Sequence, residues 1–181
     1  MYRGSNKTAL ASQHQIADAM LRMLDETPYG DISVSAVCRE ANVSRQTFYT
    51  LFQSKENVII YSLRNDCCYS EGEESVPDRE FTFRDLCDGF SEYIIHHARV
   101  LELLADNDLL PLLRTVLRED FSECGSLMSV ISPLLRPYAF DYMAAGITSI
   151  AETYIRSGRD TDCEELADII CCLMGGICGE P

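Results

Sequence analysis

The sequence predicts an all-α fold of about nine helices. Apolar residues recur at helical spacing along most of the chain, and no segment shows the sustained apolar and polar alternation of a half-buried strand. Serine, threonine and glycine residues stand at the ends of the apolar stripes, where helix caps are expected. We expect an N-terminal three-helix domain over residues 1–60 and a second, larger helical domain over residues 61–181.

The first helix is expected to end before Pro28, because proline cannot continue a helix. Its apolar stripe consists of Leu10, Ala17, Met20, Leu21 and Leu24. One side of this helix should therefore face the core of the N-terminal domain.

Two short helices follow, and each is expected to start with a serine N-cap. Ser33 can cap the second helix and Ser44 the third, because a serine hydroxyl accepts a hydrogen bond from a backbone N–H in the first turn. Asn42 lies in the turn between them and is the residue best able to adopt the left-handed conformation there. This arrangement predicts a helix-turn-helix.

The third helix separates its side chains into two sets. At about 100° per residue, Phe48, Leu51 and Phe52 share one arc that should face the first and second helices. The opposite side and its flanks carry residues that can contact DNA. Arg45 can donate two hydrogen bonds to guanine, and Gln46 can pair with adenine. We therefore expect this helix to enter the major groove.

Four further residues of this region suit the DNA backbone. They are the cap residues Ser33 and Ser44 together with Thr47 and Tyr49, whose hydroxyls can bind phosphate. Lys55 lies in the first turn of the fourth helix, where a cation is slightly unfavourable for the helix dipole. A phosphate partner would explain its position. A plain three-helix bundle with solvated Arg45 and Lys55 is the alternative that the pattern leaves open.

Beyond the third helix the pattern predicts five more helices and one loop. Ser54 should cap a helix that runs to about Ser70, and the acidic segment 71–80 should be a loop. Two stripes mark the next helices: Phe83, Leu86, Phe90, Ile94 and His97, then Leu113, Val116, Leu117, Phe121 and Cys124 after Pro111. A long helix over 138–156 should end at Gly158. A capping box from Thr161 to Glu164 should start the last helix, with the stripe Leu166, Ile170, Leu173, Met174 and Ile177.

The helix over 138–156 is apolar enough to bury nearly its whole circumference. In a small domain one face can meet the core, and the other can meet a second copy of the chain. We expect a homodimer whose interface consists of Tyr142, Ala145, Gly146, Ser149, Leu166, Ile170 and Leu173. A fully intramolecular core is the alternative.

A small-molecule effector pocket is expected in the middle of the second domain, where a few polar groups lie among apolar neighbours. Its predicted lining consists of Phe90, Tyr93, His97, Leu113, Leu117 and Phe121. For any single one of these residues, a core or surface role is the simpler explanation. His96 and His97 diverge on a helix, so we expect no metal site there.

The stretch ISVSAVCREANVSRQTFYTLFQSKENVI resembles the DNA-binding domain of TetR-type transcriptional regulators. The resemblance rests on the cap at Ser33, the VSRQTFY segment and the FQSKE segment, and it covers the region from Thr8 to Leu63. It implies DNA contacts by Ser33, Ser44, Arg45, Gln46, Thr47, Tyr49 and Lys55. It also implies a homodimer that pairs its last two helices into a four-helix bundle, with an effector pocket in the helices before them.

Composition limits the other classes of function. The net charge of −14 lies entirely in residues 61–181, whereas residues 1–60 are neutral, which is weak for a DNA-binding surface. No apolar run approaches the roughly 20 residues of a membrane span, so we expect a cytoplasmic protein. We find no catalytic constellation and expect neither an enzyme nor a cofactor. The nine cysteines are expected to be mainly small buried residues, with a redox sensor at Cys67–Cys68 or Cys171–Cys172 as the alternative.

These observations together predict a DNA-binding transcriptional regulator that acts as a homodimer on a pseudo-palindromic operator. We expect a repressor that a small-molecule effector releases. The rival hypothesis is a coactivator that keeps the fold but binds a protein partner instead of DNA, and the acidic second domain favours it.

Overall fold

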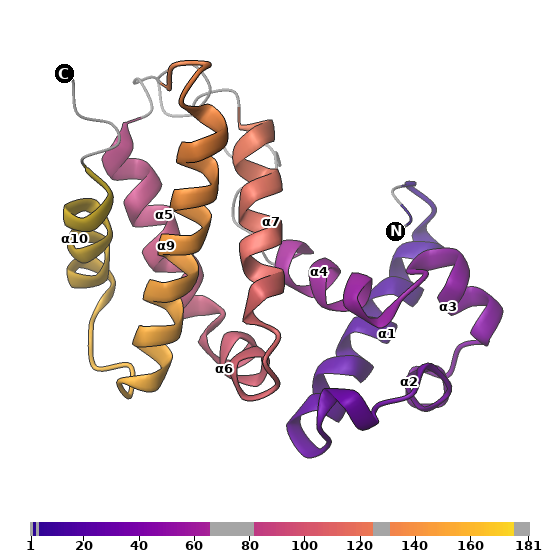
Figure 1. Ribbon diagram of the computed structural model, residues 1–181. Helices are drawn as coiled ribbons and strands as arrows, with labels where there is room; N and C mark the ends of the chain where they lie inside the picture. The colour runs from indigo at the N-terminus through magenta and orange to yellow at the C-terminus, as the bar shows by residue number, and fades with distance from the viewer. Residues whose placement is uncertain (1, 3, 66–81, 125–130, 176–181) are drawn as a thin grey trace. The chain divides into compact units, whose positions relative to one another are not determined.

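The computed structural model describes residues 2, 4–65, 82–124 and 131–175 (Figure 1). Within these ranges the chain forms nine α-helices, one 3-10 helix and no strand. The all-α prediction is therefore confirmed. The expected end of the fourth helix at Ser70, the loop 71–80 and the stripe residue Ile177 lie outside the described residues.

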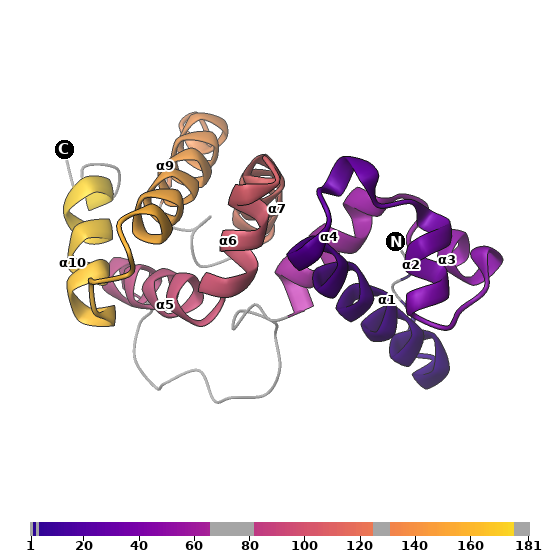
Figure 2. The ribbon, with the colours of Figure 1, turned by 90° about the horizontal axis from the view of Figure 1, so that it is seen from below.

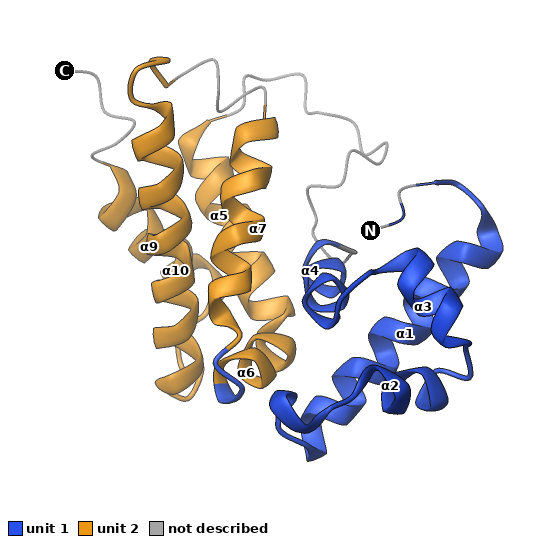
Figure 3. Ribbon diagram, turned by 45° about the vertical axis from the view of Figure 1, so that its right-hand side comes forward, with its two compact units in different colours: residues 1–66, 106–108 blue, residues 67–105, 109–181 orange. Residues whose placement is uncertain are grey.

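The chain folds into two compact units, which Figure 3 distinguishes by colour. Unit 1 consists of residues 1–66 together with 106–108, and unit 2 of residues 67–105 and 109–181. The short segment 106–108 thus belongs to the N-terminal unit, although it follows the second helix of unit 2. The proposed division of function between residues 1–60 and 61–181 stays a prediction.

Unit 1 contains α1 (Lys7–Glu26), the 3-10 helix η1 (Tyr29–Asp31), α2 (Val34–Glu40), α3 (Arg45–Leu51) and α4 (Lys55–Asn65). The helix α1 contacts α2, α3 and α4, and it forms the base of the unit. Its core includes the fully buried side chains Ile16, Met20, Ile32, Phe48, Phe52, Ile59 and Leu63. Leu10, predicted to share the buried stripe of α1, is instead 37% exposed because it lies near the start of the helix, beyond the packed region.

The predicted helix starts of unit 1 are confirmed. Ser33 accepts a hydrogen bond from the backbone N–H of Ala36 at 3.1 Å, and Ser54 accepts one from that of Asn57 at 3.3 Å. Asn42 has a φ of 53°, the left-handed conformation expected of the turn between α2 and α3. A second left-handed residue, Gln53 with a φ of 69°, makes the turn from α3 into α4 and was not predicted.

Unit 2 contains α5 (Phe83–His96), α6 (Ala98–Asp106), α7 (Leu110–Glu123), α9 (Arg136–Arg156) and α10 (Cys163–Met174). The helices α5, α7, α9 and α10 form a bundle (Figures 1 and 2). Two close pairs build it, α10 on α5 and α7 on α9, and α10 also contacts α9. None of the described helices is long and apolar enough to cross a bilayer.

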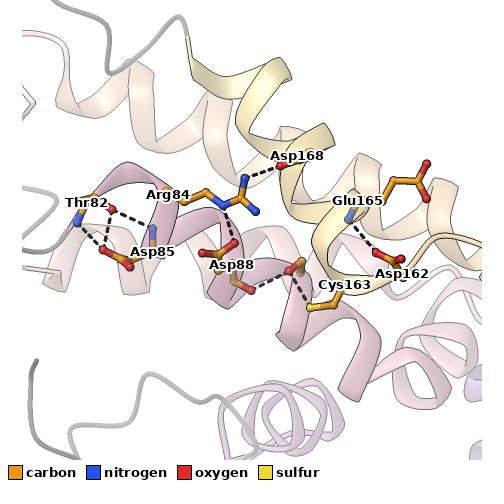
Figure 4. Close-up of polar contacts among 9 residues, drawn as sticks. Thr82, Arg84, Asp85, Asp88, Asp162, Cys163, Glu165 and Asp168 are labelled. Atoms are coloured by element: carbon orange, nitrogen blue, oxygen red, sulfur yellow. Dashed lines mark hydrogen bonds and ion pairs between the residues drawn. The ribbon is translucent and has the colours of Figure 1, made fainter.

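Two predictions for unit 2 need correction. The stripe that ends at His97 does not mark one continuous helix, because α5 ends at His96 and α6 starts at Ala98. The last helix is capped by Asp162, which accepts a hydrogen bond from the backbone N–H of Glu165 at 2.9 Å (Figure 4), and not by Thr161. Within the single chain α9 leaves Tyr138 75% exposed and Tyr142 57% exposed, so the predicted burial of its whole circumference requires a second copy and stays a prediction.

Candidate nucleic-acid interface

The helix α3 begins with a polar network at Ser44. The backbone N–H of Thr47 donates to Ser44 Oγ at 3.0 Å, and the hydroxyls of the two residues lie 2.8 Å apart. This satisfies one of the backbone donors that a helix start leaves open. The remaining N–H groups of the first turn and the positive end of the helix dipole favour an anion at this end.

An aromatic base holds α3 in place. Phe48 and Phe52 are fully buried and Leu51 is 4% exposed, as predicted from their shared arc. The Phe48 and Phe52 ring centroids lie 6.1 Å apart, and Phe52 meets Tyr61 of α4 edge to face at 5.4 Å. The buried side chains of Phe48, Leu51 and Phe52 fix one side of this two-turn helix. The other side is therefore held in a defined orientation.

The outward side of α3 is polar. Arg45, Gln46 and Thr50 are exposed, and Tyr49 is 48% exposed. The Tyr49 ring lies edge to face against buried Phe48 at 5.5 Å, which limits its motion while its hydroxyl stays accessible. Among the described residues no carboxylate forms an ion pair with Arg45, so its guanidinium is available to a partner. The structure thus presents Arg45, Gln46 and Tyr49 together, and their DNA contacts stay a prediction.

The other two predicted DNA-contacting residues lie outside α3. Ser33 is exposed at the start of α2, and its Oγ accepts from Ala36 while its own hydroxyl proton remains for another acceptor. Lys55 is half-buried at the start of α4. Its Nζ donates to the backbone oxygens of Tyr29 at 2.9 Å and Ile32 at 2.7 Å, and it lies 4.1 Å from the Tyr29 ring centroid.

These contacts give Lys55 a structural role that the sequence did not reveal. We expected a phosphate to explain a cation at a helix start, but two carbonyl groups and an aromatic face provide that explanation within the chain. An ammonium group has three donors, and the two carbonyls use two of them. A phosphate contact by Lys55 stays a prediction and would use the remaining donor.

The backbone of Tyr29 is held on both sides. Its carbonyl accepts from Lys55, and its N–H donates to Asn107 Oδ1 at 2.7 Å. Burial and the nearby Glu56 carboxylate raise the pKa of the Tyr29 side chain above its ordinary value. Sequence reasoning missed Tyr29 and Asn107, because 78 positions separate them and no local pattern signals a contact at that separation.

The six residues predicted to line an effector pocket are all buried in unit 2. Phe90 of α5 meets Phe121 of α7 edge to face at 5.6 Å. Tyr93 stacks on His97 at 4.3 Å, and His97 Nδ1 lies 2.8 Å from the Tyr93 carbonyl oxygen. Ligand binding by these residues stays a prediction.

The residues predicted to form a dimer interface differ in how exposed they are within the single chain. Leu166 and Ile170 are 2% and 1% exposed within the single chain. A side chain added at Gly146 would meet Met174 Cε of the same chain at 3.0 Å. By contrast, Tyr142, Ser149 and Leu173 are exposed. Leu166 and Ile170 therefore serve packing inside unit 2, whereas a partner can reach the exposed group together with half-buried Ala145 and Gly146, and the interface itself stays a prediction.

Among the described residues no group of three or more His, Cys, Asp or Glu side chains is placed to hold a metal ion.

Known proteins resemble this chain at two levels. Residues 16–61 match the family described as bacterial regulatory proteins, tetR family. The HTH-type dhaKLM operon transcriptional activator DhaS of Lactococcus lactis subsp. lactis (strain IL1403) is 35% identical over 60 residues. That match covers 33% of this chain and 32% of the relative, so it extends over only about a third of either protein.

Solved structures match the fold over nearly the whole chain. Lin0861 from Listeria innocua gives a TM-score of 0.78 at 16% identity, covering 97% of this chain and 96% of that one. NalD, the secondary repressor of the MexAB-OprM multidrug efflux pump in Pseudomonas aeruginosa, gives 0.58 at 17% identity, covering 94% and 96%. At such identities these two likenesses concern the fold alone.

The sequence match spans α2, α3 and most of α4, together with the second half of α1, which is the part of the chain that presents the polar side of α3. Over these residues the chain is similar to the tetR family of bacterial regulatory proteins.

Proposed function

We propose that this protein is a DNA-binding transcriptional regulator that reads its operator through α3. One observation carries the proposal: Arg45, Gln46 and Tyr49 are exposed on one side of a short helix whose opposite side is fixed by buried Phe48 and Phe52. Directed hydrogen bonds require donors held in a fixed orientation, and this arrangement supplies them. The tetR-type domain supports the same assignment.

In this proposal Arg45 and Gln46 contact base edges, whereas Ser33, Ser44, Thr47, Tyr49 and Lys55 contact phosphates. A guanidinium can donate two hydrogen bonds to guanine, and an amide can pair with adenine. Hydroxyls and an ammonium group suit phosphate oxygens, which set the register without reading the sequence. With no net charge in residues 1–60, we expect modest non-specific affinity.

A gel shift with the promoter region of the protein's own gene tests this function. Arg45→Ala should cost roughly 1–3 kcal/mol of binding free energy and relax the preference at one base pair. The matched control is Arg22→Ala, which removes the same charge from an exposed ion pair with Glu40 on α1 and α2. Equal losses for the two variants on every DNA sequence would contradict base recognition by Arg45.

We further propose a cytoplasmic homodimer that binds a pseudo-palindromic operator, with recognition helices about 34–36 Å apart. The exposed apolar residues of α9 and α10, among them Tyr142 and Leu173, support a second copy as their partner. Ala145, Gly146 and Ser149 complete the interface proposed here, without the buried Leu166 and Ile170. Sedimentation of the full chain gives its mass directly, and a monomer at micromolar concentration would contradict the dimer.

The regulator is proposed to act as a repressor that a small-molecule effector releases. An effector in the cluster of Phe90, Tyr93, His97, Leu113, Leu117 and Phe121 can shift the protein only by its differential affinity for the DNA-binding and released states. NalD, a repressor, shares the fold, although this says nothing of this chain's own operator. Deleting the gene should raise transcription of its target, and a fall would identify an activator.

The second candidate is an activator that works through a protein partner. Residues 61–181 carry the whole net charge of −14, which suits a basic protein surface. The matched relative DhaS is a transcriptional activator, so activation is compatible with this type of domain. A stoichiometric protein partner in a pull-down, with no DNA retained by the full chain, would favour this candidate.

A further inference from the structure

The residues that precede α1 lie beside the end of α3 (Figures 1 and 2), and we call residues 2 and 4–6 the N-terminal strap. The backbone N–H of Tyr2 donates to the carbonyl oxygen of Leu51, the last residue of α3, at 2.8 Å. The Tyr2 hydroxyl accepts from the backbone N–H of Asn6 at 3.4 Å, and the Asn6 side chain caps α1. The N-terminal strap therefore links the start of α1 to the end of α3.

A buried amide on α1 holds the N-terminal strap in place. Gln13 Nε2 donates to the carbonyl oxygen of Tyr2 at 3.2 Å, and Gln13 is only 1% exposed. Its Oε1 is buried and has no hydrogen-bond partner among the described residues, which disfavours folding. An apolar side chain would avoid that cost, so packing alone does not account for a glutamine at this position. The amide donor does account for it, because it fixes Tyr2 against α1.

The C-terminal end of α3 needs such external partners. The helix has seven residues, too few for a stable isolated helix, and the last carbonyl groups of any helix have no partner within it. The Leu51 carbonyl accepts from Tyr2, and the Phe52 carbonyl accepts from Asn57 Nδ2 of α4 at 2.6 Å. The N-terminal strap and α4 thus hold one end of α3, while the Ser44 cap satisfies the other.

We propose that Gln13, acting through the N-terminal strap, sets the orientation in which α3 presents Arg45 and Gln46 to DNA. Gln13 is a positioning residue, because it acts through Tyr2 and Leu51 and touches no DNA itself. Directed contacts to bases depend on orientation, whereas attraction to phosphates depends mainly on charge. Releasing the strap should therefore weaken binding to a preferred sequence more than binding to any other. This inference rests on the proposed DNA binding by α3.

Hydrogen exchange of the free, full-length protein tests the hold on α3 without DNA. Gln13→Leu removes the amide donor and leaves the net charge unchanged, and Gln15→Leu is the matched control at an exposed position of the same helix. We expect the amides of residues 45–52 to exchange about fivefold faster in Gln13→Leu, the factor for the net loss of one hydrogen bond, and those of α2 to exchange as in the wild type. The melting temperature should stay within about 4 °C of the wild type, because loss of the unpartnered Oε1 offsets the lost hydrogen bond.

Gel shifts with two DNA fragments test the orientation of α3. One fragment is the promoter region of the protein's own gene, and the other has the same length and base composition in scrambled order. Gln13→Leu should bind the promoter about five- to tenfold more weakly and the scrambled fragment as the wild type does, because the charge that faces the phosphates is unchanged. Gln15→Leu should bind both fragments as the wild type does. A protein that is merely destabilised would lose affinity for both fragments by the same factor.

Two variants at Tyr2 test the strap from its other side. Tyr2→Pro removes the N–H that reaches the Leu51 carbonyl, whereas Tyr2→Ala removes the ring and keeps that N–H. We expect residues 45–52 to exchange faster in Tyr2→Pro than in Tyr2→Ala, and the promoter to be bound more weakly by Tyr2→Pro. Circular dichroism checks the fold of every variant. If Gln13→Leu does not fold, the two Tyr2 variants replace it in both experiments.

Three results would overturn the proposal. The first is exchange in α3 that is unchanged in both Gln13→Leu and Tyr2→Pro. The second is faster exchange in α3 together with unchanged promoter binding, or with an equal loss on both DNA fragments, which would leave the strap a structural role alone. The third is a wild type that binds the promoter no better than the scrambled fragment. That result contradicts the proposed function itself, and the exchange experiment would still decide whether the strap holds α3.

Discussion

The two units differ in what they leave exposed. Of the large apolar side chains that are exposed among the described residues, Leu10 and Tyr49 lie in unit 1. The others lie in unit 2 and comprise Leu134, Leu135, Tyr138, Tyr142, Ile169 and Leu173. Unit 1 thus covers most of its large apolar side chains and presents polar groups, which suits a charged and hydrated partner such as DNA. Unit 2 presents apolar groups, which suits a protein surface.

We expect the largest effect from a substitution in the buried side of α3, which tests whether this helix has separate inner and outer sides. Phe48→Ala should reduce the free energy of unfolding by about 3–5 kcal/mol, because it removes a fully buried ring and leaves a cavity. Urea unfolding followed by circular dichroism measures the loss. Tyr49→Ala is the control, since this ring is half exposed: stability should change by less than about 1 kcal/mol while DNA retention falls. Similar destabilisation in both variants would show that α3 does not have separate inner and outer sides.

The exposed side of unit 2 can be tested without disturbing its core. Leu173→Glu places a charge among the apolar residues of α9 and α10 and should weaken the dimer by about 2 kcal/mol, roughly thirty-fold in its dissociation constant. Analytical ultracentrifugation measures the change. Thr115→Glu adds the same charge to an exposed position of α7 and should leave the mass unchanged. A dimer that tolerates Leu173→Glu would have its interface elsewhere.

The cap of α3 connects local stability to the proposed interface. Ser44→Ala removes the acceptor of the Thr47 N–H and should cost about 1 kcal/mol of unfolding free energy. Ser33→Ala, which removes the equivalent cap of α2, should cost a similar amount. The two variants should instead differ in how much DNA they retain, and we expect Ser44→Ala to retain less than Ser33→Ala. Differential scanning calorimetry together with gel shifts of both variants separates the two effects.

The smallest expected effect concerns the turn between α3 and α4. Gln53 has a φ of 69°, a conformation that a residue with a Cβ adopts at a cost. Gln53→Gly should raise the free energy of unfolding by up to about 1 kcal/mol, and Gln53→Ala should not. Thermal unfolding of the pair measures this. A gain in both variants would mean that the glutamine side chain, and not the backbone, is unfavourable there.

The contrast between the units also explains how much the sequence could predict. In unit 1 the caps at Ser33 and Ser44 and the buried Phe48 arise from residues within one or two turns of each other, so the capping preference of serine and helical periodicity located them. The role of Lys55 depends on Tyr29 and Ile32, which lie far away along the chain. No local pattern contains that contact.

In unit 2 the apolar stripes were found, but their partners were not. Leu166 and Ile170 belong to the same stripe as Leu173, yet the first two are buried inside the protomer and the third is 60% exposed. An apolar stripe indicates which residues avoid water, but it does not indicate which surface covers them. An internal neighbour and a second copy of the chain bury apolar groups equally well. Only the packing of α10 on α5 separates the two cases.

The segment 106–108 gives the N-terminal unit a component that a fragment would lack. Residues 1–66 expressed by themselves would lose the Asn107 amide oxygen, and the Tyr29 N–H would have to find water instead. The carbonyl of that same residue is what anchors Lys55. The truncated unit would therefore hold η1 less firmly, and if it binds DNA as proposed, affinities measured on it would understate those of the intact polypeptide.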